Sequence, residues 1–122
     1  MSTEARRRAA RKGFTAEMVC VWLLRAKGYR ILARRFRVPS GEIDIIARRG
    51  RSLVAVEVKA RLRFDTGADA ISSHQRRRVA RALEHFIARR PDLARLDPRF
   101  DVMLVVPRRW PRHLRDAWRS QS

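Results

Sequence analysis

The sequence has one cysteine, few acidic residues and no long apolar run. Cys20 is the single cysteine among 122 residues, which excludes an intramolecular disulfide and cannot supply a zinc cluster. We therefore expect a reducing compartment, the cytoplasm. The longest apolar stretch, residues 18–24, is far shorter than the roughly 20 residues of a membrane span, and its basic flank lacks a small-residue cleavage site. The sequence predicts neither a membrane anchor nor a signal peptide.

The scarcity of acidic residues leaves a large positive charge. Asp and Glu number 12 against 30 Lys and Arg, which gives a formal net charge of +18. Genomic base composition can explain why arginine outnumbers lysine 27 to 3, but not why both together exceed the acids. Self-repulsion of this size favours a polyanionic partner. No segment resembles a basic amphipathic membrane helix, so nucleic acid is the expected partner, DNA first and RNA not excluded.

Hydrophobic periodicity predicts two helices and four strands. The tight turn at residues 49–51 makes the second and third strands an antiparallel hairpin. The crossover helix makes the fourth strand parallel to the third, beside it or one place removed. The expected fold is α/β, a mixed central sheet flanked by helices in the order αβββαβ. Its helices cover residues 14–24 and 73–90, and its strands cover 29–38, 42–48, 53–59 and 100–106.

We expect one domain over residues 13–106, with a basic segment at each end. Residues 1–12 form either a mobile basic arm or the frayed start of the first helix. Residues 107–122 form a basic tail, in which Pro111 can open a short last helix. For Trp110 and Trp118, docking of the tail on the core is favoured over stacking on bases.

The predicted hairpin carries a cluster of charged residues. Glu42 and Asp44 share one face of their strand, with isoleucines on the other, and Glu57 and Lys59 share a face of the next strand. Crowded carboxylates repel and lose solvation, so a cation would relieve them. Hard oxygen ligands suit Mg²⁺ or Mn²⁺, which can bridge to phosphate and acidify a bound water. On spacing alone, a solvated salt-bridge ladder remains an alternative.

These residues lie in segments that closely resemble the YraN-like family of the restriction-endonuclease-like, or PD-(D/E)XK, superfamily. The resemblance implies an αβββαβ core, Asp44 and Glu57 as metal ligands and Lys59 as the catalytic lysine. Glu17 resembles the first-helix acid of related Holliday-junction resolvases. Ile43 stands where the superfamily motif has proline. The resemblance covers residues 13–106, and its matching segments are 28–32 (GYRIL), 41–46 (GEIDII), 56–61 (VEVKAR) and 99–102 (RFDV).

Several other residues receive an expected role. In many relatives the second helix offers Lys or Gln to the site, and Gln75 is the candidate, although Ser72-x-x-Gln75 favours a capping box. Glu17 suits a metal cleft, with the helix dipole as its alternative. We expect Glu42 to pair with an arginine, Asp101 to be structural and Trp22 to pack. The phosphate backbone is expected to contact Arg61, Arg63, Arg77, Arg78 and Arg81.

The sequence therefore favours a Mg²⁺-dependent DNA endonuclease, with branched or damaged DNA as candidate substrates. Water activated by a metal at Asp44 and Glu57 would attack phosphorus, assisted by Lys59. The alternative is a non-catalytic nucleic-acid-binding module that keeps the nuclease fold. Related resolvases act as dimers, so a homodimer is a conjecture from the resemblance. The sequence contains no aromatic RNA-binding motif, which ranks an RNA accessory role last.

Overall fold

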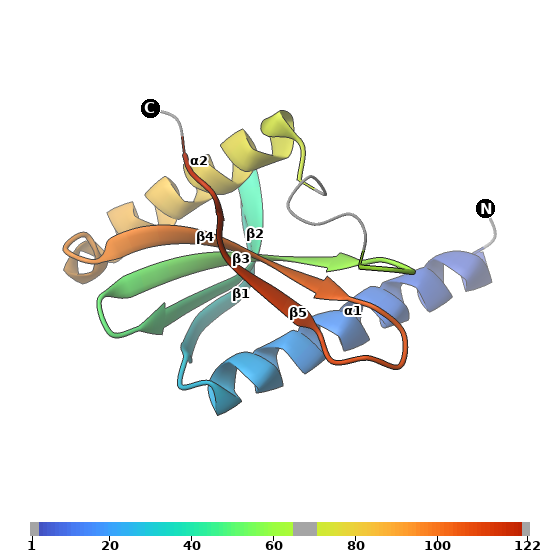
Figure 1. Cartoon of the computed structure of the whole chain (residues 1–122). Helices are drawn as coiled ribbons and strands as arrows, with labels where there is room; N and C mark the ends of the chain where they lie inside the picture. Colours follow the sequence, from blue (N-terminus) through green and yellow to red (C-terminus); the bar gives the residue numbers. More distant parts are fainter. Residues whose placement is uncertain (1–2, 65–70, 121–122) are drawn as a thin grey trace.

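The structure is a computed structural model that describes residues 3–64 and 71–120, with side chains from residue 15 onward. It contains two long helices and five strands (Figure 1). Both helices confirm their sequence predictions, although the first begins 11 residues earlier and ends two residues later than predicted, and the second ends one residue earlier. The elements are α1 (Thr3–Ala26), β1 (Arg30–Val38), β2 (Gly41–Arg49), β3 (Ser52–Ala60), α2 (Ser73–Arg89), the 3₁₀ turn η2 (Pro91–Leu93), β4 (Asp97–Val105) and β5 (Arg112–Trp118).

The five strands form one mixed sheet in the order β1-β2-β3-β4-β5. The β2–β3 pair is an antiparallel hairpin and β4 lies directly beside β3 in parallel, so both pairing predictions are confirmed. The helices cover opposite faces of the sheet. One core packs α2 residues such as Leu83 against Ile46 and Val102, and the other packs α1 residues such as Leu24 against Ile45. The fold is a restriction-endonuclease-like α/β core.

The prediction of a short helix after Pro111 is wrong, because residues 112–118 form the edge strand β5. The register shifts between Phe100 and Val102, which pair with Trp118 and Leu114. Between these two pairs, Asp101 of β4 therefore faces residues 115–117 of β5, and Asp116 adopts a left-handed φ of 51° at the bulge. The bulge puts Leu114 and Trp118 into the same core although they are four residues apart. In the sequence, apolar residues at this spacing are the pattern of an amphipathic helix.

The three tryptophans have different environments. Trp118 is 5% exposed and stacks on Phe100 with ring centroids 4.1 Å apart, which confirms the docking prediction for this residue. Trp110 is 81% exposed, so the same prediction is wrong there. The prediction that Trp22 packs in the core is also wrong, because Trp22 is 62% exposed on α1 and lies under the guanidinium of Arg25. Helical periodicity identified the apolar residues of α1 without showing which of them lack a neighbouring strand.

Helix α1 begins at Thr3, so of the two alternatives for residues 1–12 the helical one is confirmed from Thr3 onward. The side chains of these residues lie outside the part of the chain that the structure describes. Among the residues that the structure describes, no helix is both long and apolar enough to cross a membrane.

At the start of β2, the sheet and α2 make main-chain contact. A Cβ atom at Gly41 would overlap the carbonyl group of Arg78, so only glycine fits there. This contact lies one helical turn beyond Gln75 on α2.

Candidate active site

The site forms where β2 and β3 separate. Their pairing ends at Ile45 and Val56, and the carboxylates of the next residues occupy the gap. The backbone N–H of Val58 donates to Oδ2 of Asp44 at 2.8 Å, and the N–H of Asp44 donates to Oε1 of Glu57 at 3.4 Å. These side-chain contacts replace the missing ladder hydrogen bonds. The two carboxylates are thereby held side by side by the backbone of the opposite strand.

Strand alternation also breaks at this point. Ile43 belongs to the core under α2, whereas Ile45 belongs to the core under α1. The expectation that the isoleucines share one face is therefore wrong. The separation of the strands lets the chain rotate at Asp44, which turns this side chain toward the gap.

Gln75 joins the site through its side chain. Nζ of Lys59 donates to Oε1 of Gln75 at 3.2 Å, and Nε2 of Gln75 donates to Oε2 of Glu57 at 3.1 Å. Its backbone N–H donates to Oγ of Ser72 at 3.1 Å, which caps α2. The capping prediction is confirmed for the backbone N–H, while the side chain contacts Lys59 and Glu57 rather than the backbone of Ser72. One amide therefore fixes the lysine and the buried carboxylate relative to each other.

The two carboxyl groups are held in an environment that opposes their ionisation. Glu57 is 2% exposed. Burial, reinforced by the charge of Asp44, raises the pKa of Glu57 from 4.5 to about 8. Burial also raises the pKa of Asp44, against the opposing hydrogen bond from Val58, and the charge of Glu17 adds to the rise. A divalent cation would reverse this penalty by favouring both carboxylates in their ionised form.

A pH dependence of stability follows from the raised pKa of Glu57. Between pH 4.5 and about pH 8 the folded state holds a proton that the unfolded state has released, so stability falls as the pH rises through this window. Denaturation by urea in EDTA is expected to show this decline and a smaller slope for Glu57→Gln. The exposed carboxylate variant Glu42→Gln should keep the wild-type slope. Equal slopes for Glu57→Gln and wild type would contradict the burial argument.

Glu17 lies near the site but is already engaged. It is 5% exposed, and its two carboxylate oxygens lie 3.4 Å from Nε of Arg34 and 3.0 Å from Nε of Arg35. Arg35 adopts a left-handed φ of 51°, an uncommon conformation for arginine. The negative charge of Glu17 still reaches the site, since it contributes to the raised pKa of Asp44. The assignment of Glu17 as a catalytic acid stays a prediction.

The donor set fits a hard divalent cation with few protein ligands. Within the described residues, no group of three or more His, Cys, Asp or Glu side chains is placed to hold a metal. Mg²⁺ commonly takes only one or two carboxylates and completes its shell with water and substrate phosphate oxygens. Asp44 and Glu57 can supply those two, because each ionised carboxylate has about four lone-pair sites and only part of them accept the hydrogen bonds described above.

The predicted DNA-contacting arginines lie on two elements that meet at this site. Arg61 and Arg63 follow Lys59 at the end of β3, where Arg63 is exposed and Arg61 is half-buried. The others lie on α2 beyond Gln75: Arg77 and Arg81 are exposed, and Arg78 is half-buried. Glu42 forms the expected arginine pair, with Nε of Arg37 3.4 Å from its carboxylate.

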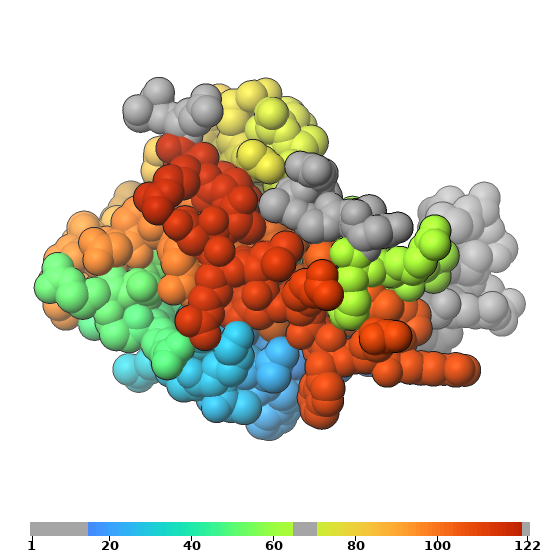
Figure 2. Space-filling model, viewed as in Figure 1, coloured from blue at the N-terminus to red at the C-terminus, as the bar shows by residue number. Residues whose placement is uncertain are grey.

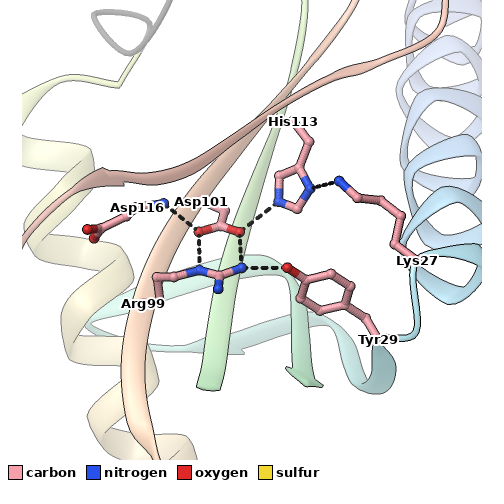
Figure 3. Close-up of polar contacts among 6 residues, drawn as sticks. All are labelled: Lys27, Tyr29, Arg99, Asp101, His113 and Asp116. Carbon is pink, nitrogen blue, oxygen red and sulfur yellow. Dashed lines mark hydrogen bonds and ion pairs between the residues drawn. The ribbon is translucent and has the colours of Figure 1, made fainter. Parts of the chain in front are cut away.

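A second polar cluster supports β4 and β5 (Figure 3). Asp101 is fully buried and accepts two hydrogen bonds from Arg99, at 2.9 and 2.8 Å, which confirms its structural role. Nε2 of His113 donates to Asp101 at 2.7 Å and the N–H of Asp116 donates at 2.9 Å. Two further contacts extend the cluster: Arg99 donates to the Tyr29 hydroxyl and Lys27 to Nδ1 of His113. The contacts of His113 could not be inferred from the sequence, because its partners lie far away along the chain.

This chain therefore combines a restriction-endonuclease-like core with a paired-carboxylate and lysine cluster. The sequence model of a family described as Uncharacterised protein family UPF0102 matches residues 16–105. A UPF0102 protein of Parvibaculum lavamentivorans is 58% identical over 111 residues, 91% of this chain and 84% of that protein. Another, of Methylorubrum extorquens, is 50% identical over 119 residues, 97% of this chain and 93% of that protein. The chain belongs to the UPF0102 family, the YraN family, which confirms the resemblance.

Proposed function

We propose that this protein is a Mg²⁺- or Mn²⁺-dependent endonuclease that hydrolyses phosphodiester bonds in DNA. One observation carries the proposal: Asp44 and Glu57 are held together in a gap between two strands, and Lys59 is linked to the same pair through Gln75. Burial makes this pair costly without a cation, since it raises the pKa of both carboxyl groups. The net charge of +18 suits a phosphodiester substrate.

Each group has a separate task in this proposal. Asp44 and Glu57 hold the cation, which when bound offsets phosphate charge and acidifies a coordinated water. Lys59, positioned by Gln75, orients the attacking water or offsets charge that grows on the phosphate. The arginines on α2 and after β3 hold the DNA backbone without reading its sequence. Branched or damaged DNA remains the candidate substrate that the resolvase resemblance suggests.

Metal binding is the first test of the proposal. Calorimetric titration of Mn²⁺ into the wild type should show one saturable site. The Asp44→Asn variant is expected to bind at least 10-fold more weakly, because even outer-shell partners of a metal typically contribute roughly 10- to 100-fold. Glu42→Gln is the matched control, since this carboxylate lies two residues earlier on β2 but pairs with Arg37 in solvent. Equal Mn²⁺ affinity in wild type and Asp44→Asn would contradict the proposal that Asp44 binds the metal.

Cleavage is the second part of the test. Purified protein is incubated with labelled duplex, flap and four-way junction DNA, each with Mg²⁺, Mn²⁺ or EDTA. The proposal requires products that depend on the divalent ion and on Asp44. Salt-sensitive binding without products on any of these substrates would favour the non-catalytic module instead.

A further inference from the structure

The end of the sheet beyond Lys59 carries two exposed apolar side chains. Among the described residues, Leu62 and Trp110 are the most exposed large hydrophobic side chains, at 85% and 81%. Leu62 follows β3, and Trp110 lies in the turn between β4 and β5. An indole left in water forgoes the free energy that an aromatic ring gains on burial. A fixed turn that presents one to solvent therefore favours a partner with a flat apolar face.

A hydrogen bond and a cation–π contact join these two segments. The N–H of Arg61 donates to the carbonyl of Val105 at 2.9 Å, which extends the β3–β4 pairing past the strand ends. The guanidinium of Arg112 lies 4.5 Å from the ring centroid of Phe64. Figure 2 shows the orange-red turn beside the yellow-green end of β3 at one projecting corner of the molecule. We call residues 59–64 and 105–112 the end surface.

The end surface is basic throughout. Neither of its two segments contains an acidic residue. Its cations are Lys59, Arg61, Arg63, Arg108, Arg109 and Arg112. Arginines beside an exposed indole match the two parts of a nucleotide, since the guanidinium groups suit its phosphate and the ring suits its base. A hydrophobic protein partner would not require this excess of positive charge.

The turn that carries Trp110 is constrained. Pro107 and Pro111 flank it and fix their φ angles, and Pro111 is buried. The N–H of Arg109 donates to the carbonyl of Val106 at 3.3 Å, and Arg108 is held at a left-handed φ of 63°. A constrained turn reduces the entropy that binding must overcome. Trp110 is thus presented by a rigid support rather than by a loose tail.

We infer that the end surface is a stacking site for unpaired nucleotides of DNA, with Trp110 as the platform and the arginines as phosphate contacts. The inference rests on the proposed function, because it defines the substrate of the same site as one that contains a single-stranded segment. Leu62 lies three residues beyond Lys59, at most roughly 10 Å away along the chain. That length corresponds to about three stacked nucleotides, so the unpaired segment lies next to the bond that is cut.

Binding without metal tests this inference separately from catalysis. Fluorescence anisotropy in EDTA measures affinity for a labelled oligothymidylate and for a blunt duplex of equal length. Trp110→Ala is expected to weaken binding to the single strand by about tenfold, a typical effect for loss of one stacking ring, and to leave duplex binding unchanged. Trp110→Phe should retain most of the single-strand affinity. Trp22→Ala, which removes another exposed indole beside an arginine, should change neither.

The outcomes separate the two proposals. An equal loss on single strand and duplex, no loss on the single strand, or the same loss for Trp22→Ala would overturn the stacking site. Each of those results leaves metal-dependent cleavage at Asp44 untouched. Selective loss with Trp110→Ala in a protein that cuts no DNA would support the stacking site and contradict the nuclease. Because Trp110 is exposed, its variants should fold, and thermal melting verifies this.

Discussion

Replacing Lys59 with methionine is expected to reduce metal-dependent DNA cleavage at saturating substrate by roughly 10²- to 10⁴-fold, the usual effect of losing one positioned proton-transfer or charge-stabilising group. Methionine keeps the length and apolar stem of lysine but removes its cationic end. That end donates to Gln75, which in turn donates to the buried Glu57. The variant therefore removes the ammonium group of Lys59 while both carboxylate ligands of Mn²⁺ stay in place. Mn²⁺ binding should persist.

Arg61→Met provides the matched control for this experiment. It removes one positive charge two residues farther along the same segment, at a side chain that donates a hydrogen bond to the carbonyl of Ala60. We expect Arg61→Met to raise KM and to leave kcat close to that of the wild type, because a phosphate contact acts on binding. If Lys59→Met kept the wild-type kcat, or if both variants lost kcat equally, Lys59 would have no special role in the chemistry.

The second large effect concerns stability rather than catalysis. Asp101→Ala is expected to lower the free energy of unfolding by about 3–5 kcal/mol, the usual loss when one partner of a buried ion pair is removed. The carboxylate is fully buried and accepts hydrogen bonds from Arg99, His113 and the backbone of Asp116. Although burial alone raises its pKa, the hydrogen bonds from His113 and Arg99 hold the pKa of Asp101 below the ordinary value. Arg99 and the bulge of β5 would both lose their acceptor.

Urea denaturation near neutral pH measures this loss. Glu42→Gln serves as the comparison, because the Arg37–Glu42 pair is exposed and such pairs typically contribute at most about 1 kcal/mol. Since the folded-state pKa of Asp101 is lowered, its stabilisation is complete above the unfolded-state pKa and is lost as the pH falls through the folded-state value. A loss for Asp101→Ala as small as that for Glu42→Gln would show that the cluster in Figure 3 contributes little to stability.

The sequence predicted the parts of the fold in which local pattern and structure agree. The hairpin of β2 and β3 follows from a tight turn between two regular strands, and it brings Asp44 and Glu57 side by side as predicted. Strand β5 was missed because the bulge at Asp116 spaces its buried residues as a helix would. The side-chain contacts of Gln75 could not be inferred from the sequence, because its partners, Lys59 and Glu57, lie on a strand 16 and 18 residues away, and no short-range pattern records such contacts.

The main-chain contact between Gly41 and Arg78 has a consequence for how the candidate site keeps its shape. Where two backbones touch, their separation is set by hydrogen and carbonyl radii, which do not adjust as rotamers do. Helix α2 is therefore clamped to the start of the strand that carries Asp44, only one turn from the amide that holds Lys59. Substitutions among the apolar side chains farther along α2 therefore need not move this contact, which keeps Gln75 in register with Asp44 and Lys59.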